Sequence, residues 1–261
     1  MTRYKNPGRK KRVGLAVGGG AVRGIAHVGV ISVLEEAGIE IDFVAGCSSG
    51  AILASLLAAG WETESIKEFA YRLNWWLMAR PVWPSRGFLS LAMLEKLLNR
   101  ELNGKSFNDL KLPCTIIATD IETGMPVRLN EGSVAEAVHA SCCIPGLVTP
   151  KNLNGRLLVD GAICDMVPVS VLNDMGADYV IGVDIFSFNL RRYLGPFGYL
   201  IASFEILLER AGGGIEQADC LVTPRVKGKT WLRFSKKEEL YNLGRSAAIE
   251  KIDDICNDLR F

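Results

Sequence analysis

The chain has 261 residues, of which 49% are hydrophobic and 23% charged, and its formal net charge is +1. This composition is ordinary for a globular protein, and the length allows one large α/β domain or two small ones. The first twelve residues hold six basic and no acidic side chains, which leaves a net charge of −5 on the rest. The body of the protein therefore lacks the positive charge typical of nucleic-acid binding, and we expect no nucleic-acid partner.

We expect two regions, a basic and flexible arm over residues 1–11 and a single domain over residues 12–261. A solvated terminus is the ordinary interpretation of such an arm, and weak affinity for anionic lipid headgroups is the alternative. No apolar run approaches the roughly 18 residues that span a bilayer. The basic start leads into a glycine-rich segment instead of the apolar core of a signal peptide. These features predict a cytoplasmic protein, with peripheral association at the inner membrane face as the alternative.

The seven cysteines are scattered and odd in number, without C-x-x-C spacing, which indicates neither a zinc site nor a disulfide framework. They are expected to be small buried hydrophobic residues, at Cys47, Cys114, Cys142, Cys143, Cys164, Cys220 and Cys256. No metal or organic cofactor is required by the chemistry proposed below.

Apolar runs and helical patterns alternate along the chain. The opening predicts a strand over residues 13–17, a glycine loop, a helix over 22–36, a strand over 42–46 and a largely apolar helix over 51–59. Further strands are predicted over residues 114–118, 125–129, 156–159, 179–183, 220–223 and 231–234, and a C-terminal helix over 238–259. The alternation predicts an α/β fold with a mainly parallel central sheet and helices on both faces.

Two segments fit no regular element. Residues 74–88 carry three of the five tryptophans, Trp75, Trp76 and Trp83, with prolines that interrupt any helix. They are interpreted either as a flap at a membrane surface or as an irregular loop whose aromatic side chains fold back on the core. Residues 187–198 are interpreted as a solvated loop.

The sequence Gly46-Cys47-Ser48-Ser49-Gly50 follows the second predicted strand and opens the next helix. Glycines on either side of a serine at this spacing allow a tight turn that presents the hydroxyl above the sheet edge. Ser48 is therefore a candidate nucleophile for acyl transfer. A five-residue match of this kind also arises by chance at an ordinary strand-to-helix corner.

Backbone N–H groups are the second requirement of a serine nucleophile, because they stabilise the oxyanion. The glycine loop over residues 18–24 follows the first strand, so its amides face the same crevice. The alternative is a dinucleotide-binding loop, since Gly18, Gly20 and Gly24 resemble a loosened G-x-G-x-x-G with Asp42 about 20 residues on. Its spacing is off by one, and it leaves the glycines around Ser48 unexplained.

The general base is the third requirement. His27 and His139 are the only histidines. His27 is expected to be a hydrogen-bonded helix residue, and His139 has no carboxylate at an obvious spacing. Asp160 ends a predicted strand, where functional side chains often project. A carboxylate replaces imidazole only when it is partly desolvated and aimed at the hydroxyl. We infer a Ser48–Asp160 dyad.

Four motifs, in this order, resemble the patatin-like phospholipase family. They are the glycine loop with Arg23 and Gly24, the turn over residues 46–50, the stretch 140–145, and Asp160-Gly161-Ala162 followed by residues 167–169. The match covers roughly residues 12–185 and implies a three-layer patatin-like fold. It further implies a lipid acyl hydrolase with Ser48 as nucleophile and Asp160 as base. The oxyanion donors that it implies are the backbone N–H groups of the glycine loop at Gly19, Gly20 and Ala21.

Several neighbouring residues are given supporting roles. Arg23 either holds a lipid phosphate or ties the loop down, and the structural role is favoured. Gly18, Gly46 and Gly50 support the two turns. The side chains of Cys47 and Ser49 are expected to point away from the crevice. Asp120 and Glu122 are interpreted as solvated carboxylates of a hairpin turn, with a general-acid pair as the alternative.

The function expected from these features is hydrolysis of a fatty-acyl ester, in a phospholipid or related lipid, through an acyl-Ser48 intermediate. The alternative is a catalytically weak membrane-surface or regulatory protein on the same scaffold.

Overall fold

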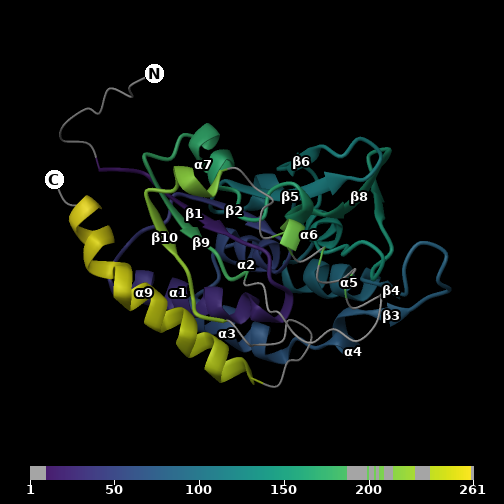
Figure 1. Cartoon of the computed structure of the whole chain (residues 1–261), viewed down its shortest axis with the longest axis horizontal. Coiled ribbons are helices and arrows are strands. Elements are labelled where there is room, and N and C mark those ends of the chain that lie inside the picture. The colour runs from purple at the N-terminus through teal and green to yellow at the C-terminus, as the bar shows by residue number, and fades with distance from the viewer. Residues whose placement is uncertain are drawn as a thin grey trace.

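Five parallel strands form one half of the central sheet (Figure 1). They lie in the order β10 (Cys220–Val222), β9 (Tyr179–Val183), β1 (Val13–Val17), β2 (Phe43–Cys47) and β5 (Cys114–Asp120). The other half is antiparallel and consists of β6 (Pro126–Leu129), β8 (Arg156–Asp160) and β7 (Lys151–Leu153). The structure is a computed structural model that describes residues 10–186, 199, 203, 206–208, 214–226 and 236–259.

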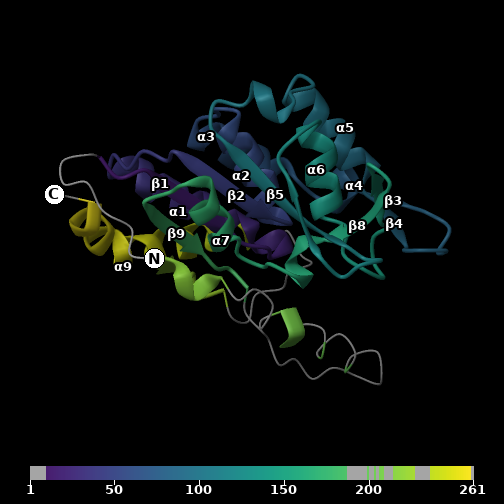
Figure 2. The same ribbon diagram turned by 90° about the horizontal axis from the view of Figure 1, so that it is seen from above.

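Helices cover both faces of the sheet, as Figure 2 shows. Successive residues of β1 point to opposite faces, so that Leu15 and Val17 join one hydrophobic cluster and Ala16 joins the other. The larger cluster includes side chains from α1 (Ile25–Glu36), α2 (Ser49–Ala58), α3 (Thr63–Arg72), α5 (Ala92–Glu101), α6 (Val134–Ser141) and α9 (Lys237–Leu259). The smaller cluster lies under α7 (Val169–Met175) and η4 (Ile215–Gln217). The predicted three-layer arrangement is confirmed.

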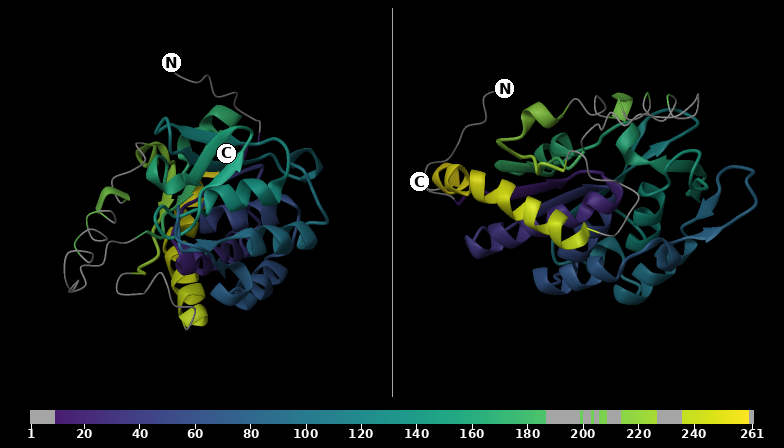
Figure 3. Two further views of the ribbon diagram at one scale, coloured as in Figure 1. Left: turned by 90° about the vertical axis from the view of Figure 1, so that its right-hand side faces the viewer. Right: turned by 60° about the horizontal axis from the view of Figure 1, so that its bottom comes forward.

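The C-terminal helix α9 lies against α1, as the right-hand view of Figure 3 shows. Two glycines make this contact close. A Cβ added at Gly244 would lie 1.9 Å from the carbonyl oxygen of Ala26, and one added at Gly29 would lie 2.1 Å from that of Tyr241. Because only glycine lacks a Cβ, these two positions let the helix backbones touch.

One edge of β5 pairs with two different strands, one after the other along its length. β2 pairs with β5 as far as Cys47 opposite Ile117, and β8 pairs with it from Asp160 opposite Ala118. β6 pairs with β5 at both of these positions, so it occupies the other edge, and β2 and β8 must share this one. Because β8 is antiparallel to β5 and β2 is parallel to it, the carboxyl ends of β2 and β8 meet.

The shorter elements refine the predicted pattern. The helix predicted over residues 22–36 is divided into a 3₁₀ turn, η1 (Ala21–Gly24), and α1. Residues 74–88 contain α4 (Trp75–Met78) and the first strand of a hairpin formed by β3 (Arg80–Pro81) and β4 (Leu89–Ser90). Two further 3₁₀ turns are η2 (Phe107–Asp109) and η3 (Gly161–Ile163). The predicted strand over residues 231–234 and the predicted loop over 187–198 lie outside the described residues.

The predicted turn after β5 is a hairpin, as expected, with Gly124 at φ +71°. The prediction that both carboxylates are solvated is wrong for Asp120. Its side chain is buried and accepts the backbone N–H of Glu122 at 3.0 Å. The carboxylate therefore closes the turn instead of facing water.

The end of the predicted basic arm is held against the domain. Lys10 pairs with Glu40, and Arg12 pairs with Asp178 at 3.3 Å. Residues 1–9 lie outside the described part of the chain, so the flexible arm and the domain division stay predictions. Within the described residues, no helix is both long enough and apolar enough to span a bilayer.

Candidate active site

Ser48 occupies a strained turn between β2 and α2. Its backbone has φ 52° and ψ −121°, a conformation that a residue with a Cβ rarely adopts. The turn is packed closely, because a Cβ added at Gly50 would lie 2.1 Å from the carbonyl oxygen of Val17. One added at Gly46 would lie 2.6 Å from the carbonyl oxygen of Gly50. The flanking glycines therefore allow the turn to fit against the end of β1.

The hydroxyl of Ser48 donates a hydrogen bond to Oδ2 of Asp160 at 2.7 Å. The other oxygen of Asp160, Oδ1, accepts the backbone N–H of Ala162 at 3.0 Å. Both side chains are buried, at 6% and 5% exposure. Burial raises the pKa of Asp160 from 3.8 to about 6, although the hydrogen bonds from Ala162 and Ser48 oppose this rise. The structure thus brings the two residues of the inferred dyad into contact.

The stretch over residues 140–145 connects both partners. The hydroxyl of Ser141 accepts the N–H of Ser48 at 2.8 Å and donates to the carbonyl of Ile117 at 2.6 Å. The carbonyl of Cys143 accepts the N–H of Asp160 at 2.9 Å. No separate role for Ser141 was predicted from the sequence. Its position in one of the four motifs was the available signal.

The glycine loop lies directly beside Ser48. A Cβ added at Gly19 would lie 3.4 Å from the Cβ of Ser48. The N–H of Gly19 donates to the carbonyl of Met166 at 3.1 Å, so in this conformation it does not serve as an oxyanion donor. The oxyanion role predicted for Gly19 would require this hydrogen bond to break. The N–H groups of Gly20 and Ala21 have no acceptor among the described residues. Gly18 supports the loop, because its N–H pairs with the carbonyl of Val183 at 3.1 Å.

The remaining loop and turn residues differ in their surroundings. The Arg23 side chain is buried, at 2% exposure, which agrees with the favoured structural role. The thiol of Cys47 lies 3.8 Å from Oδ1 of Asp160, and burial raises its pKa well above the ordinary value. It therefore stays protonated. Ser49 was expected to point away from the crevice, but it lines the cavity beside Ser48, and its hydroxyl has no partner among the described residues.

His27 holds the glycine loop. Its Nε2–H donates to the carbonyl of Gly18 at 2.8 Å, and the ring is fully buried. Burial lowers the pKa of His27 to about 4, so the imidazole is neutral at physiological pH. The expected hydrogen-bonded helix histidine is confirmed.

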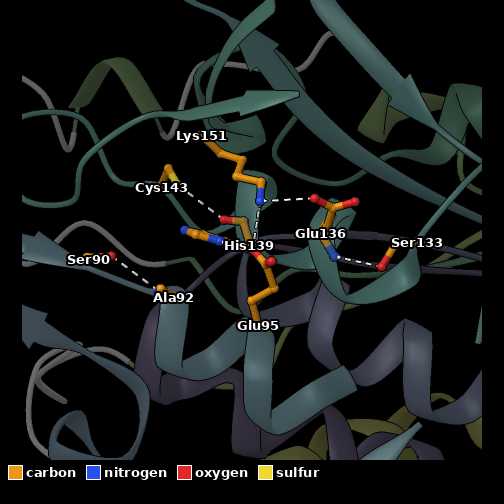
Figure 4. A network of polar contacts seen from close by, with 8 residues as sticks. All are labelled: Ser90, Ala92, Glu95, Ser133, Glu136, His139, Cys143 and Lys151. Atoms are coloured by element: carbon orange, nitrogen blue, oxygen red, sulfur yellow. Dashed lines mark hydrogen bonds and ion pairs between the residues drawn. The ribbon is translucent and has the colours of Figure 1, made fainter. Parts of the chain in front are cut away.

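His139 belongs to a polar network between α5, α6 and β7 (Figure 4). Its Nδ1 lies 2.5 Å from a carboxylate oxygen of Glu95, which also pairs with Lys151 at 2.8 Å. Lys151 further pairs with Glu136 at 3.1 Å. No carboxylate stands at an obvious spacing from His139 in the sequence, and its partner Glu95 approaches from another helix 44 residues away.

An apolar cavity adjoins the Ser48 hydroxyl. Besides Ser48, it is lined mainly by hydrophobic side chains from α2 to α5, among them Ile52, Leu53, Phe69, Leu73, Met78 and Leu91. The site therefore combines a buried serine–carboxylate pair with a space that accepts hydrocarbon.

The dinucleotide alternative is not supported by the position of Asp42. Its carboxylate accepts the N–H of Val13 at 2.7 Å, where β1 begins, whereas the glycine loop follows the opposite end of that strand. A carboxylate at that end of the sheet is not placed for a ribose held near the loop. Among the described residues, no group of three or more His, Cys, Asp or Glu side chains has the geometry to hold a metal ion.

Comparison with known proteins agrees with the geometry. A profile of the patatin-like phospholipase family matches residues 15–173. An uncharacterized NTE family protein of Mycobacterium tuberculosis is 36% identical over 177 residues, which cover 67% of this chain and 49% of that protein. Lysophospholipase NTE1 of Meyerozyma guilliermondii is 33% identical over 205 residues, which cover 76% of this chain and 14% of that protein. The chain thus spans about half the length of the mycobacterial relative and a smaller part of the fungal one.

Solved structures share the fold. VipD from Legionella pneumophila has a TM-score of 0.66 and 14% sequence identity, covering 94% of this chain and 67% of that one. ExoU from Pseudomonas aeruginosa has a TM-score of 0.53 and 16% identity, covering 97% of this chain and 54% of that one. The chain belongs to the patatin-like phospholipase family, as the match of the family profile to more than half of the chain establishes.

Proposed function

We propose that the protein is a serine lipid acyl hydrolase in which Ser48 is the nucleophile and Asp160 the general base. The observation that carries the proposal is the 2.7 Å hydrogen bond from Ser48 Oγ to Asp160 Oδ2, in a buried turn beside an apolar cavity. Family membership supports the same class of reaction.

In the first half of the reaction, Asp160 accepts the hydroxyl proton while Ser48 Oγ attacks the ester carbonyl. The tetrahedral intermediate then collapses, the bond to the leaving alcohol breaks, and Asp160 returns the proton to that alcohol. In the second half, water gives a proton to Asp160 and attacks the acyl carbon. The bond to Ser48 breaks, Oγ recovers the proton, and the fatty acid leaves.

The raised pKa of Asp160 suits it to both directions of proton transfer. A carboxylate of pKa about 6 is ionised at neutral pH and is a stronger base than an exposed aspartate. Because this pKa lies near the working pH, the protonated carboxyl group can also return its proton to the leaving alkoxide. The proposed chemistry therefore predicts a rate that rises as the pH passes upward through about 6.

The amides of Gly20 and Ala21 are the proposed oxyanion donors, because neither has an acceptor among the described residues. Each donor of this kind contributes about 3 kcal/mol to catalysis in other hydrolases. The N–H of Gly19 would join them only if it released the carbonyl of Met166.

The apolar cavity supports a fatty-acyl chain as the part of the substrate next to the scissile ester. Phospholipids and lysophospholipids are the proposed substrates, and a relative is named as a lysophospholipase. Release of free fatty acid from a panel of these lipids tests the substrate class.

A fluorophosphonate probe tests the nucleophile, because it labels only an activated hydroxyl. We expect labelling of the natural protein at Ser48, and neither labelling nor lipid hydrolysis with Ser48→Ala. Ser49→Ala is the matched control, since its hydroxyl lies in the same cavity without contacting Asp160. Labelling that persists in Ser48→Ala, or a natural protein that is folded but unlabelled, would contradict the proposal and favour a regulatory role.

A further inference from the structure

Residues 75–90, here called the aromatic hairpin, comprise α4, β3, β4 and the loop between the strands. The loop extends from the body on the side away from α9 (Figures 1 and 2). Its side chains are unusually exposed for their type: Trp83 is 87% exposed, Trp76 86%, Phe88 61% and Val82 37%. Trp76 belongs to α4, whereas the other three side chains belong to the loop region. Several large exposed apolar side chains within one short segment mark an interaction surface.

The hairpin is anchored firmly at its base. The N–H groups of Phe88 and Leu89 both donate to the carbonyl of Leu147, at 2.9 and 3.0 Å, and the N–H of Thr149 donates back to Leu89 at 2.8 Å. A Cβ added at Gly87 would lie 2.6 Å from the backbone of Val148. These contacts fix the backbone beside Phe88, and the N–H of Val82 donates to the carbonyl of Phe88 at 3.0 Å, which ties the opposite side of the loop to it.

The same elements line the cavity beside Ser48. In α4, Trp75 and Met78 line the cavity, whereas Trp76 points to solvent. Val148, which pairs with Leu89 at the base of the hairpin, also lines the cavity. The exposed aromatic surface and the hydrocarbon-lined cavity are thus two sides of one short segment.

The charge of this segment has a single sign. From Phe69 to Leu94 the sequence contains three arginines, Arg72, Arg80 and Arg86, and no aspartate or glutamate. Arg72 lies 3.8 Å from Glu101, whereas Arg80 and Arg86 are exposed and form no ion pair with any described residue. Aromatic side chains between exposed arginines fit the interface of a membrane that carries anionic headgroups.

We propose that the aromatic hairpin docks the protein on an anionic phospholipid surface, with Trp76, Trp83 and Phe88 entering the interface and Arg80 and Arg86 contacting headgroups. This inference rests on the proposed function for its substrate but not for its test. Docking in this orientation would bring the cavity next to the lipid from which an acyl chain enters.

Vesicle sedimentation in the Ser48→Ala background measures docking without hydrolysis. Vesicles of phosphatidylcholine mixed with phosphatidylglycerol are compared with phosphatidylcholine alone. The triple variant Trp76→Ser, Trp83→Ser, Phe88→Ser removes the exposed aromatic side chains. Met125→Ser and Ile249→Ser are matched controls, because these side chains are 62% and 56% exposed on other elements.

We expect the triple variant to lose at least about tenfold in vesicle binding, since interfacial affinity follows the apolar area inserted. Arg80→Gln with Arg86→Gln should lose roughly fivefold per arginine on the anionic vesicles alone, and high salt should remove that difference. The controls should bind as the parent does. An unchanged melting temperature in each variant shows that the fold is retained.

Failure of docking and failure of catalysis give different results. With Ser48 intact, the triple variant should hydrolyse vesicle lipid more slowly but a short water-soluble ester at the parental kcat/KM. A parent that does not bind either vesicle, or a triple variant that binds as well as the parent, would overturn the proposal. Equal loss on vesicle lipid and soluble ester would also overturn it, because it would assign the hairpin to the active-site structure.

Discussion

Asp160→Asn should make the protein inactive and, at alkaline pH, more stable. The substitution replaces a buried carboxylate with a neutral side chain of nearly the same shape. Asn still accepts the N–H of Ala162, but its amide takes no proton from Ser48. If burial holds the pKa of Asp160 at about 6, the ionised carboxylate destabilises the folded state, and Asn removes that effect.

The sign and magnitude follow from the two pKa values, 3.8 in the unfolded chain and about 6 in the folded protein. Between them the folded state binds more protons, so stability falls as the pH rises through this window. A tenfold change in an acid constant corresponds to about 1.4 kcal/mol, which gives a cost of about 3 kcal/mol at pH near 8. Below the unfolded value both states are protonated, and the cost disappears.

Urea unfolding of the natural protein and of Asp160→Asn over a range of pH measures this difference. We expect the variant to be more stable by about 3 kcal/mol above the folded pKa, with the gap closing toward pH 4. Asp174→Asn is the matched control, because its carboxylate is 62% exposed and no buried charge is removed. A gap that does not change with pH, or a variant less stable at alkaline pH, would refute the reasoning.

Three further experiments test the residues that support the site. Ser141→Ala removes the acceptor of the buried Ser48 N–H and the donor to the Ile117 carbonyl, which should cost roughly 2–3 kcal/mol in urea unfolding and lower kcat. Parental stability would contradict the bridging role of Ser141. Gly50→Ala should prevent folding. Gly132→Ala, where a Cβ would enter open space at φ +76°, should lower the free energy of unfolding by only about 1 kcal/mol. A Gly50→Ala variant that folds would contradict the close packing of Gly50 against β1. His27→Gln with His139→Gln should retain substantial ester turnover, and a folded but inactive protein would end the carboxylate-base proposal.

Local sequence patterns determined most of the elements. Strands β1, β2, β5, β8 and β9 were predicted within about two residues, because a strand buried on both faces is a continuous apolar run bounded by turn residues. The turn around Ser48 was also recognisable, since its glycines meet a local requirement for close packing. Asp160 was predicted to be the partner of Ser48 because it stands at the end of a predicted strand and because the motifs resemble those of the patatin-like family.

Tertiary structure decided the contacts between these elements. Only the pairing of β8 with the edge of β5 beyond β2 brings Asp160 to Ser48, and no local pattern specifies that register. The engaged amide of Gly19 and the carboxylate beside His139 likewise depend on partners far away in the chain. The periodicity of apolar residues indicates which side chains are buried. Which residue each buried side chain contacts depends on how elements distant in the sequence pack together.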